Sequence, residues 1–96
     1  MRLPLAALMI CSLAVAAGCA GNPNSSLARQ CESGLSVAYK ELDFARAKGF
    51  GGTVEHSKAA GLLTAAKVQF EFGKYPNCID KVDRARAFIA RSRTGG

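Results

Sequence analysis

Apolar side chains recur at alternating spacings of three and four residues in three stretches of this chain, and no other feature constrains its fold as much. The stretches contain, in order, Ala28, Cys31, Leu35, Ala38, Leu42 and Ala45, then Ala59, Leu63, Ala66 and Phe70 with Leu62 and Val68 beside them, then Cys78, Val82, Ala85 and Ile89. An α-helix has about 3.6 residues per turn, so this spacing places the apolar side chains on one helix face. We therefore predict three amphipathic helices and an all-α fold.

Residues that cap or end helices separate the three stretches. The first helix is predicted to be capped by Ser25 or Ser26 and to end near Gly49, the second to follow Thr53 and end at Gly73, and the third to carry Pro76 in its first turn. The short loops between the helices favour antiparallel neighbours. Residues 27–93 are therefore expected to form an antiparallel three-helix bundle or an open helical array.

A segment without charge precedes the helices. Arg2 is the single basic residue before position 29, and no charged side chain occurs from Leu3 to Gly18. This layout is typical of an export signal. As a helix the segment spans roughly 24 Å, which is short of the roughly 30 Å of hydrocarbon that a permanent membrane helix must cross. An export signal therefore fits the segment better than a transmembrane anchor.

The end of this segment, Ala16-Ala17-Gly18-Cys19, resembles the lipobox of bacterial lipoproteins, with Ala16 where such boxes most often carry Leu. In these proteins the signal peptide is cleaved before a cysteine that is lipidated and becomes the first residue. The resemblance implies a signal peptide over residues 1–18, lipidation of Cys19, and a lipidated cysteine with a flexible tether over residues 19–26. The alternative is an ordinary secreted protein in which Cys19 is incidental.

The resemblance also implies a location. In Gram-negative lipoproteins an aspartate directly after the lipidated cysteine commonly signals retention in the inner membrane, and here that position is Ala20. We therefore expect an outer-membrane protein that is lipid-anchored and faces the periplasm. Export makes nucleic acid an improbable partner class, so no nucleic-acid binding is predicted.

Two of the four cysteines remain once Cys19 is assigned to the lipid and Cys11, which follows Ile10, to the signal. An even pair in an oxidising compartment is expected to be bridged. Cys31 and Cys78 each lie near the start of a predicted helix, and an up-down-up bundle places both starts at one end. We predict a structural disulfide between them. A redox-active pair is the alternative, and their spacing does not suit it.

Catalytic and metal-binding patterns are sparse. The single histidine is His56, next to Glu55. Adjacent residues on a helix point about 100° apart, so they form no ready acid and base pair, and His56 is expected to face solvent or be partly packed. One histidine without a CxxC motif provides no zinc ligand set. We predict no catalytic residue, no metal, no cofactor and no enzymatic activity, with a small hydrolase or redox enzyme as the least supported alternative.

The exported part is basic, because residues 19–96 keep 12 of the 13 basic residues and all 7 acidic ones, a net charge of +5. The predicted third helix carries Lys81, Arg84 and Arg91 on one face, with Lys74 before them and Arg86 and Arg93 on a neighbouring face. This pattern indicates either a solvated outer surface, with Asp80 and Arg84 as an ordinary i,i+4 pair, or a patch for an anionic partner. We expect exposed phenylalanines beside the patch, among Phe44, Phe50, Phe72 and Phe88, to distinguish the two.

Two further resemblances bear on function. Leu62, Ala65, Ala66, Gly73, Tyr75, Cys78, Val82 and Ala85 resemble a single tetratricopeptide unit over residues 62–89, without a second copy. The stretch Glu32–Ser92, with the lipobox, resembles a group of short uncharacterised outer-membrane lipoproteins of Gram-negative bacteria. These resemblances imply a helical domain without a defined activity. We predict a non-catalytic structural or binding module that contacts an envelope protein or an anionic envelope component, or alternatively an accessory subunit of an envelope complex that binds a partner protein through its helical hairpin.

Overall fold

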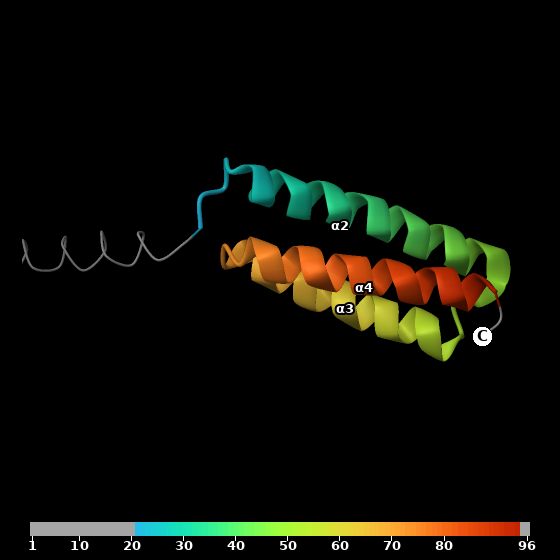
Figure 1. The fold of residues 1–96 in the computed structure, drawn as a ribbon. Helices are drawn as coiled ribbons and strands as arrows, with labels where there is room; N and C mark the ends of the chain where they lie inside the picture. The colour runs from blue at the N-terminus through green and yellow to red at the C-terminus, as the bar shows by residue number, and fades with distance from the viewer. Residues whose placement is uncertain (1–20, 95–96) are drawn as a thin grey trace, which may run out of the picture.

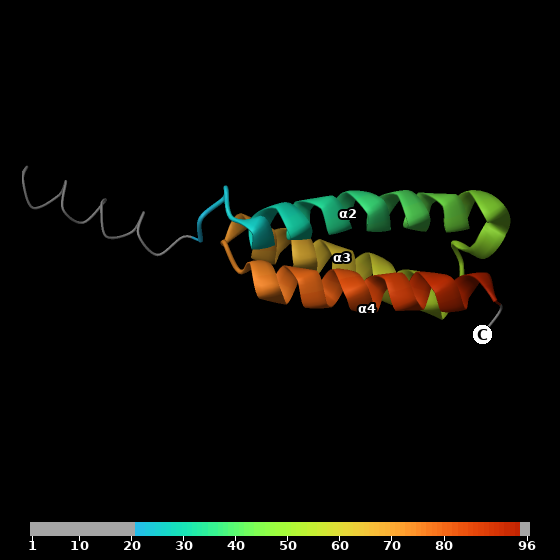
Figure 2. The same ribbon diagram turned by 45° about the horizontal axis from the view of Figure 1, so that its top comes forward.

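The computed structural model describes residues 21–94 of the chain, and these residues form a three-helix bundle. Its elements are α2 (Ser26–Ala45), the π-helical segment η1 (Arg46–Phe50), α3 (Val54–Glu71) and α4 (Tyr75–Arg93). Helices α2 and α4 run in the same direction and α3 runs in the opposite one (Figures 1 and 2). Each long helix contacts the other two. The predicted all-α fold is confirmed as a closed, up-down-up bundle.

The caps of α2 and α3 are those that the sequence predicts. The Ser25 hydroxyl accepts a hydrogen bond from the backbone N–H of Ala28 at 3.1 Å. The Thr53 hydroxyl accepts one from the N–H of His56, also at 3.1 Å. Each cap satisfies an N–H group that has no partner within the first turn of its helix, and so fixes where the helix begins.

Two glycines with positive φ end the first two helical segments. Gly49 has φ 96° and lies inside η1, and Gly73 has φ 74° in the α3–α4 loop. Side chains disfavour this conformation, which is why glycine occupies both positions. The predicted ends of the helices are confirmed, although regular α-helix stops at Ala45 and the chain continues to Gly49 in a wider π turn.

The core consists of the predicted stripes and is dominated by small side chains. Its fully enclosed members, with at most 1% of their surface exposed, include Ala28, Cys31, Ala38, Ala45, Ala59, Leu63, Ala66, Cys78 and Ala85. Phe70 and Leu62 are half-buried against this core. Val68 was expected to widen the stripe of α3, but it is 47% exposed. Successive side chains on a helix point about 100° apart, so Val68, two residues after Ala66, points to roughly the opposite side of α3.

The start of the described chain contains a hydrogen-bonded turn. The N–H of Asn24 donates to Asn22 Oδ1 at 3.0 Å, and the N–H of Ser25 donates to the Asn22 carbonyl at 3.1 Å. An asparagine side chain that bonds the backbone two residues later is a common turn former. Within the expected tether, residues 22–25 therefore form a turn, and Ser26 is the first residue of α2.

Candidate functional site

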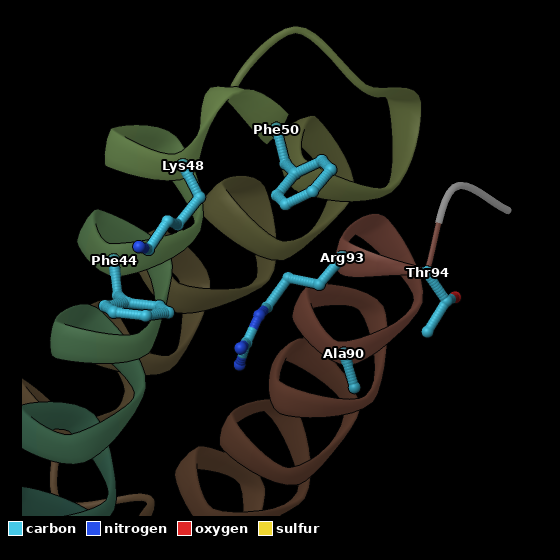
Figure 3. Close-up of a pocket in the computed structure, with 6 residues that line it drawn as sticks. All are labelled: Phe44, Lys48, Phe50, Ala90, Arg93 and Thr94. Carbon is cyan, nitrogen blue, oxygen red and sulfur yellow. The ribbon is translucent and has the colours of Figure 1, made fainter.

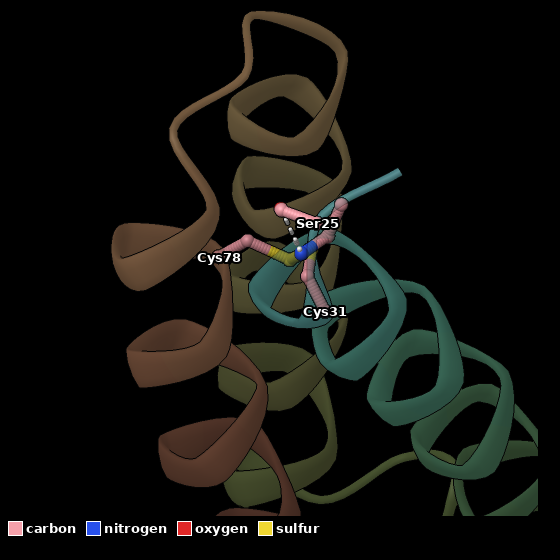
Figure 4. The surroundings of a disulfide bond; sticks show 4 residues. Ser25, Cys31 and Cys78 are labelled. Carbon is pink, nitrogen blue, oxygen red and sulfur yellow. Dashed lines mark hydrogen bonds between the residues drawn. A yellow bond between two sulfur atoms is a disulfide. The ribbon is translucent and has the colours of Figure 1, made fainter. Parts of the chain in front are cut away.

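A disulfide joins α2 to α4 at the end of the bundle where both helices begin (Figure 4). It connects Cys31 and Cys78, whose Cα atoms lie 5.8 Å apart and whose side chains are fully buried. The pairing is the one that the cysteine count and the bundle topology predict. Because the bridge lies in the core, away from solvent, it fits a structural role.

The same end of the bundle receives the chain that comes from the predicted lipidation site. Gly21 lies against the α3–α4 loop, so closely that a β-carbon on it would be 2.5 Å from the Gly73 carbonyl oxygen and 2.9 Å from the Tyr75 ring. Cys11 and Cys19 lie outside the described residues. We call this end the anchor end, and the opposite end, with η1 and Thr94, the far end.

His56 is buried, which corrects the expectation of a solvent-facing or partly packed side chain. Only 4% of its surface is exposed, and its Nε2 atom lies 3.2 Å from the carbonyl oxygen of Leu42. A carbonyl oxygen can only accept, so Nε2 carries the proton and donates to it. The ring thus joins the first turn of α3 to α2. Buried polar groups are generally hydrogen-bonded, and this bond accounts for the histidine without a catalytic role.

Among residues 21–94, no cluster of three or more histidine, cysteine, aspartate or glutamate side chains is arranged to hold a metal ion. In the same part of the chain, none of the helices has the length and apolarity needed to cross a membrane.

The residues of the predicted basic patch lie in two separate places on the bundle. Lys74 occupies the N-cap position of α4 at the anchor end, without a side-chain capping bond, whereas Arg84 and Arg91 lie along α4 next to α3. Lys81 precedes Arg84 by three residues and therefore shares this side of α4. Arg84 pairs with Asp80 at 3.8 Å, as the i,i+4 spacing predicts. Both partners are more than half exposed, so this ion pair contributes little to stability.

Residues of α3 that the sequence did not assign to the patch complete it. A shallow cavity of about 410 Å³ between α3 and α4 is lined by Lys58, Gly61, Leu62, Ala65, Arg84 and Phe88. The Lys58 Nζ atom lies 5.4 Å and the Arg91 guanidinium 4.3 Å from the centre of the Phe88 ring. Cations this close to an aromatic face are attracted to it. The arrangement is a concave apolar surface edged by positive charge, which we call the α3–α4 groove.

Arg86 is engaged within the bundle. Its Nε and Nη2 atoms donate to Glu41 Oε1 at 2.7 Å and to Glu41 Oε2 at 3.1 Å. These hydrogen bonds and the carboxylate charge raise the pKa of Arg86. The pair links α2 to α4 and removes Arg86 from the set of cations free for a partner.

A second cavity, of about 530 Å³, lies at the far end between the last turns of α2 and α4 (Figure 3). Lys48 and Arg93 both lie over the ring of Phe44, with the Lys48 Nζ 5.4 Å and the Arg93 guanidinium carbon 4.9 Å from its centre. Both cations lie in the last turn of a helical segment, Lys48 in η1 and Arg93 in α4, where carbonyl groups carry partial negative charge. The helix ends therefore account for these two cations without an external anion.

The four phenylalanines considered as neighbours of the basic patch differ in how far they are exposed. Phe44 and Phe72 are exposed, at 47% and 68%, whereas Phe50 and Phe88 are half-buried against the core. Phe72 lies at the C-cap of α3 and Phe88 inside the α3–α4 groove. Of these four, Phe88 is the one that lies beside Arg84 and Arg91, and because it is half-buried it leaves only part of its ring surface open next to the basic side of α4.

The chain matches no protein-family model, and comparisons with curated proteins and with solved structures found no match.

Proposed function

We propose that this chain is an outer-membrane lipoprotein, anchored through a lipid on Cys19, whose helical bundle is a non-catalytic structural or binding module in the periplasm. The observation that carries the proposal is Ala16-Ala17-Gly18-Cys19 at the end of an uncharged segment.

The disulfide supports export. A buried bridge between Cys31 and Cys78 that ties two helices together requires an oxidising compartment, and the periplasm is one. Gly21 lies at the same end of the bundle, so a lipid two residues earlier holds this end near the bilayer and leaves the far end directed away from it. The resulting arrangement presents the long sides of the helices to the periplasm.

The intact mass of the protein extracted from membranes tests the proposal. We expect a chain that begins at Cys19, carries added acyl mass and gains two hydrogens when treated with a reductant. The matched control is Cys19→Ser, which should lose the acyl mass and keep residues 1–18. An unmodified parent chain would contradict the lipoprotein assignment.

A second candidate function is an accessory subunit of an envelope complex. The α3–α4 groove favours it, because Leu62, Ala65 and Phe88 leave apolar surface half-exposed on the hairpin. Cross-linking in intact cells separates the candidates. One dominant protein partner cross-linked to the hairpin supports the adaptor role, whereas cross-links to lipid or cell-wall material alone support the structural role.

A further inference from the structure

Helix α3 carries a second apolar stripe on the side opposite its core residues. Its members are Val54, Gly61, Ala65, Val68 and the C-cap residue Phe72. With Lys58 in the remaining place, they recur at spacings of four, three, four, three and four, the period of a helix-packing seam. The large members are open to solvent, with Val54 64%, Val68 47% and Phe72 68% exposed. A surface helix of a monomer ordinarily carries polar residues on this side.

Gly61, at the centre of this outer stripe, has no role inside the bundle. A β-carbon built on it meets no atom within 4 Å, so no neighbouring helix requires its missing side chain. Its φ is not positive, so the backbone does not require glycine either. Glycine disfavours a helix interior, and a close approach from outside is the physical reason that remains.

The edge of the stripe that faces α4 is positively charged. Lys58 and Arg84 line the α3–α4 groove, and Arg91 lies over Phe88 beside them. Asp80, paired with Arg84, offsets part of this charge, and Glu55 lies one turn before Lys58. Lys81 adds a further cation on the same side of α4. The balance remains positive and so complements an acidic partner.

We propose that the outer stripe of α3 and the α3–α4 groove form the docking surface for an amphipathic helix of a partner protein, with acidic residues beside its apolar seam. An apolar side chain of that helix inserts over Gly61, between Ala65 and Phe88, and its carboxylates face Lys58, Arg84 and Arg91. The inference rests on the proposed role as a binding module and names the surface and the chemistry of the partner.

The shape and charge of the surface favour this occupant over two others. A second copy of this chain would bring the same basic row against the first, and like charges across an interface oppose association. A bilayer is bound by protruding bulky side chains, whereas Gly61 and Ala65 make the middle of this surface hollow. A hollow between apolar ridges instead fits the knob of a packing helix.

Two synthetic helical peptides of about three heptads test the proposal. Both carry leucine at the seam positions, and one has glutamate and its twin has lysine at the flanking positions. We expect the glutamate peptide to bind the full lipoprotein in detergent at least about tenfold more tightly than the lysine twin. Its affinity should fall as salt is raised until the Debye length is well below about 10 Å.

Gly61→Leu and Thr64→Leu form the matched pair of variants. Thr64 is exposed on the same helix but lies outside the outer stripe. Gly61→Leu fills the hollow and should weaken the binding of the glutamate peptide by at least about tenfold. The bundle should become no less stable, because the new side chain meets open space. Thr64→Leu should leave the affinity unchanged. The same detergent in every sample keeps partition into micelles equal.

Two results would overturn the inference. One is equal affinity for the two peptides, as expected of a surface that rests on the bilayer or on a second copy of this chain. The other is an affinity that Gly61→Leu does not change. Neither result bears on the acyl mass at Cys19, so failure of this inference is distinguishable from failure of the lipoprotein assignment.

Discussion

Gly21 lies against the carbonyl group of Gly73, and a β-carbon at Gly21 would come within 2.5 Å of that oxygen. The two residues are far apart in the chain, but the start of the described chain and the α3–α4 loop lie at the same end of the bundle (Figure 1). Gly73 itself has φ 74°, which turns the chain from α3 into α4. The contact therefore joins the segment that follows the proposed lipid to the loop of the helical hairpin.

Gly21→Ala should release this contact. A β-carbon so close to a carbonyl oxygen forces the two backbones apart, so we expect the turn after Gly21 to open and the Ser25 N–H, which bonds Asn22, to exchange with solvent at least about tenfold faster. Hydrogen exchange followed by NMR measures this. Gly52→Ala is the control, because a β-carbon there meets no atom within 4 Å. Unchanged exchange at Ser25 in both variants would show that the contact does not hold the turn.

Loss of the disulfide should remove much of the stability of the bundle. The Cys31–Cys78 bridge closes a loop with a sequence separation of 47. A loop of this length contributes about 4 kcal/mol by restricting the unfolded chain, which is comparable to the whole stability of a domain this small. We expect Cys31→Ala/Cys78→Ala to unfold at a much lower urea concentration than the oxidised parent. The reduced parent is the control and should behave similarly. A variant with the midpoint of the oxidised parent would contradict a stabilising role.

Replacing glycine by alanine should change the stability of the bundle in opposite directions at Gly49 and at Gly61. Gly49 has φ 96°, so Gly49→Ala places a side chain in a disfavoured conformation and should destabilise the bundle by about 1 kcal/mol. Gly61 lies within α3 with open space around it, so Gly61→Ala should stabilise by about 0.5–1 kcal/mol. Paired thermal unfolding curves measure both. If both substitutions stabilised the bundle, or both destabilised it, the explanation from the backbone conformations of Gly49 and Gly61 would be contradicted.

The parts of the fold that depend on neighbouring residues could be predicted from the sequence. The caps at Ser25 and Thr53 involve hydrogen bonds only three residues long, and the buried stripes follow from the helical period alone. The Cys31–Cys78 pairing also could be predicted, because only two cysteines remained and helix order placed them together. The burial of His56 could not, because its partner, the Leu42 carbonyl, lies on another helix and has no sequence signal.

The candidate site could be predicted only in part, for the same reason. The basic row on α4 is visible in the sequence, but its apolar border comes from α3, and which side of α3 faces it depends on packing. Val68 illustrates the difficulty, because a second stripe at helical spacing is indistinguishable from a broad core stripe until the neighbours of α3 are known. The Gly61 hollow likewise becomes informative only when the space around it is seen to be open.

The Glu41–Arg86 ion pair should couple α2 to α4 more strongly than a typical surface pair. It makes two hydrogen bonds, of 2.7 and 3.1 Å, and its side chains are 37% and 46% exposed, which leaves some solvent screening. We expect a coupling of about 0.5–1 kcal/mol from a double-mutant cycle of Glu41→Gln and Arg86→Gln, measured by urea unfolding.

The Asp80–Arg84 pair provides the matched comparison for this cycle. Its atoms are 3.8 Å apart and its side chains 65% and 58% exposed, so its coupling should not exceed about 0.3–0.5 kcal/mol. Salt is a useful variable because ions screen both pairs, whereas alkaline pH is not, because Glu41 raises the pKa of Arg86 and its guanidinium stays charged. Added salt should therefore weaken both couplings. Equal coupling energies for the two pairs would mean that the two hydrogen bonds between Glu41 and Arg86 add no stability beyond that of an ordinary surface ion pair.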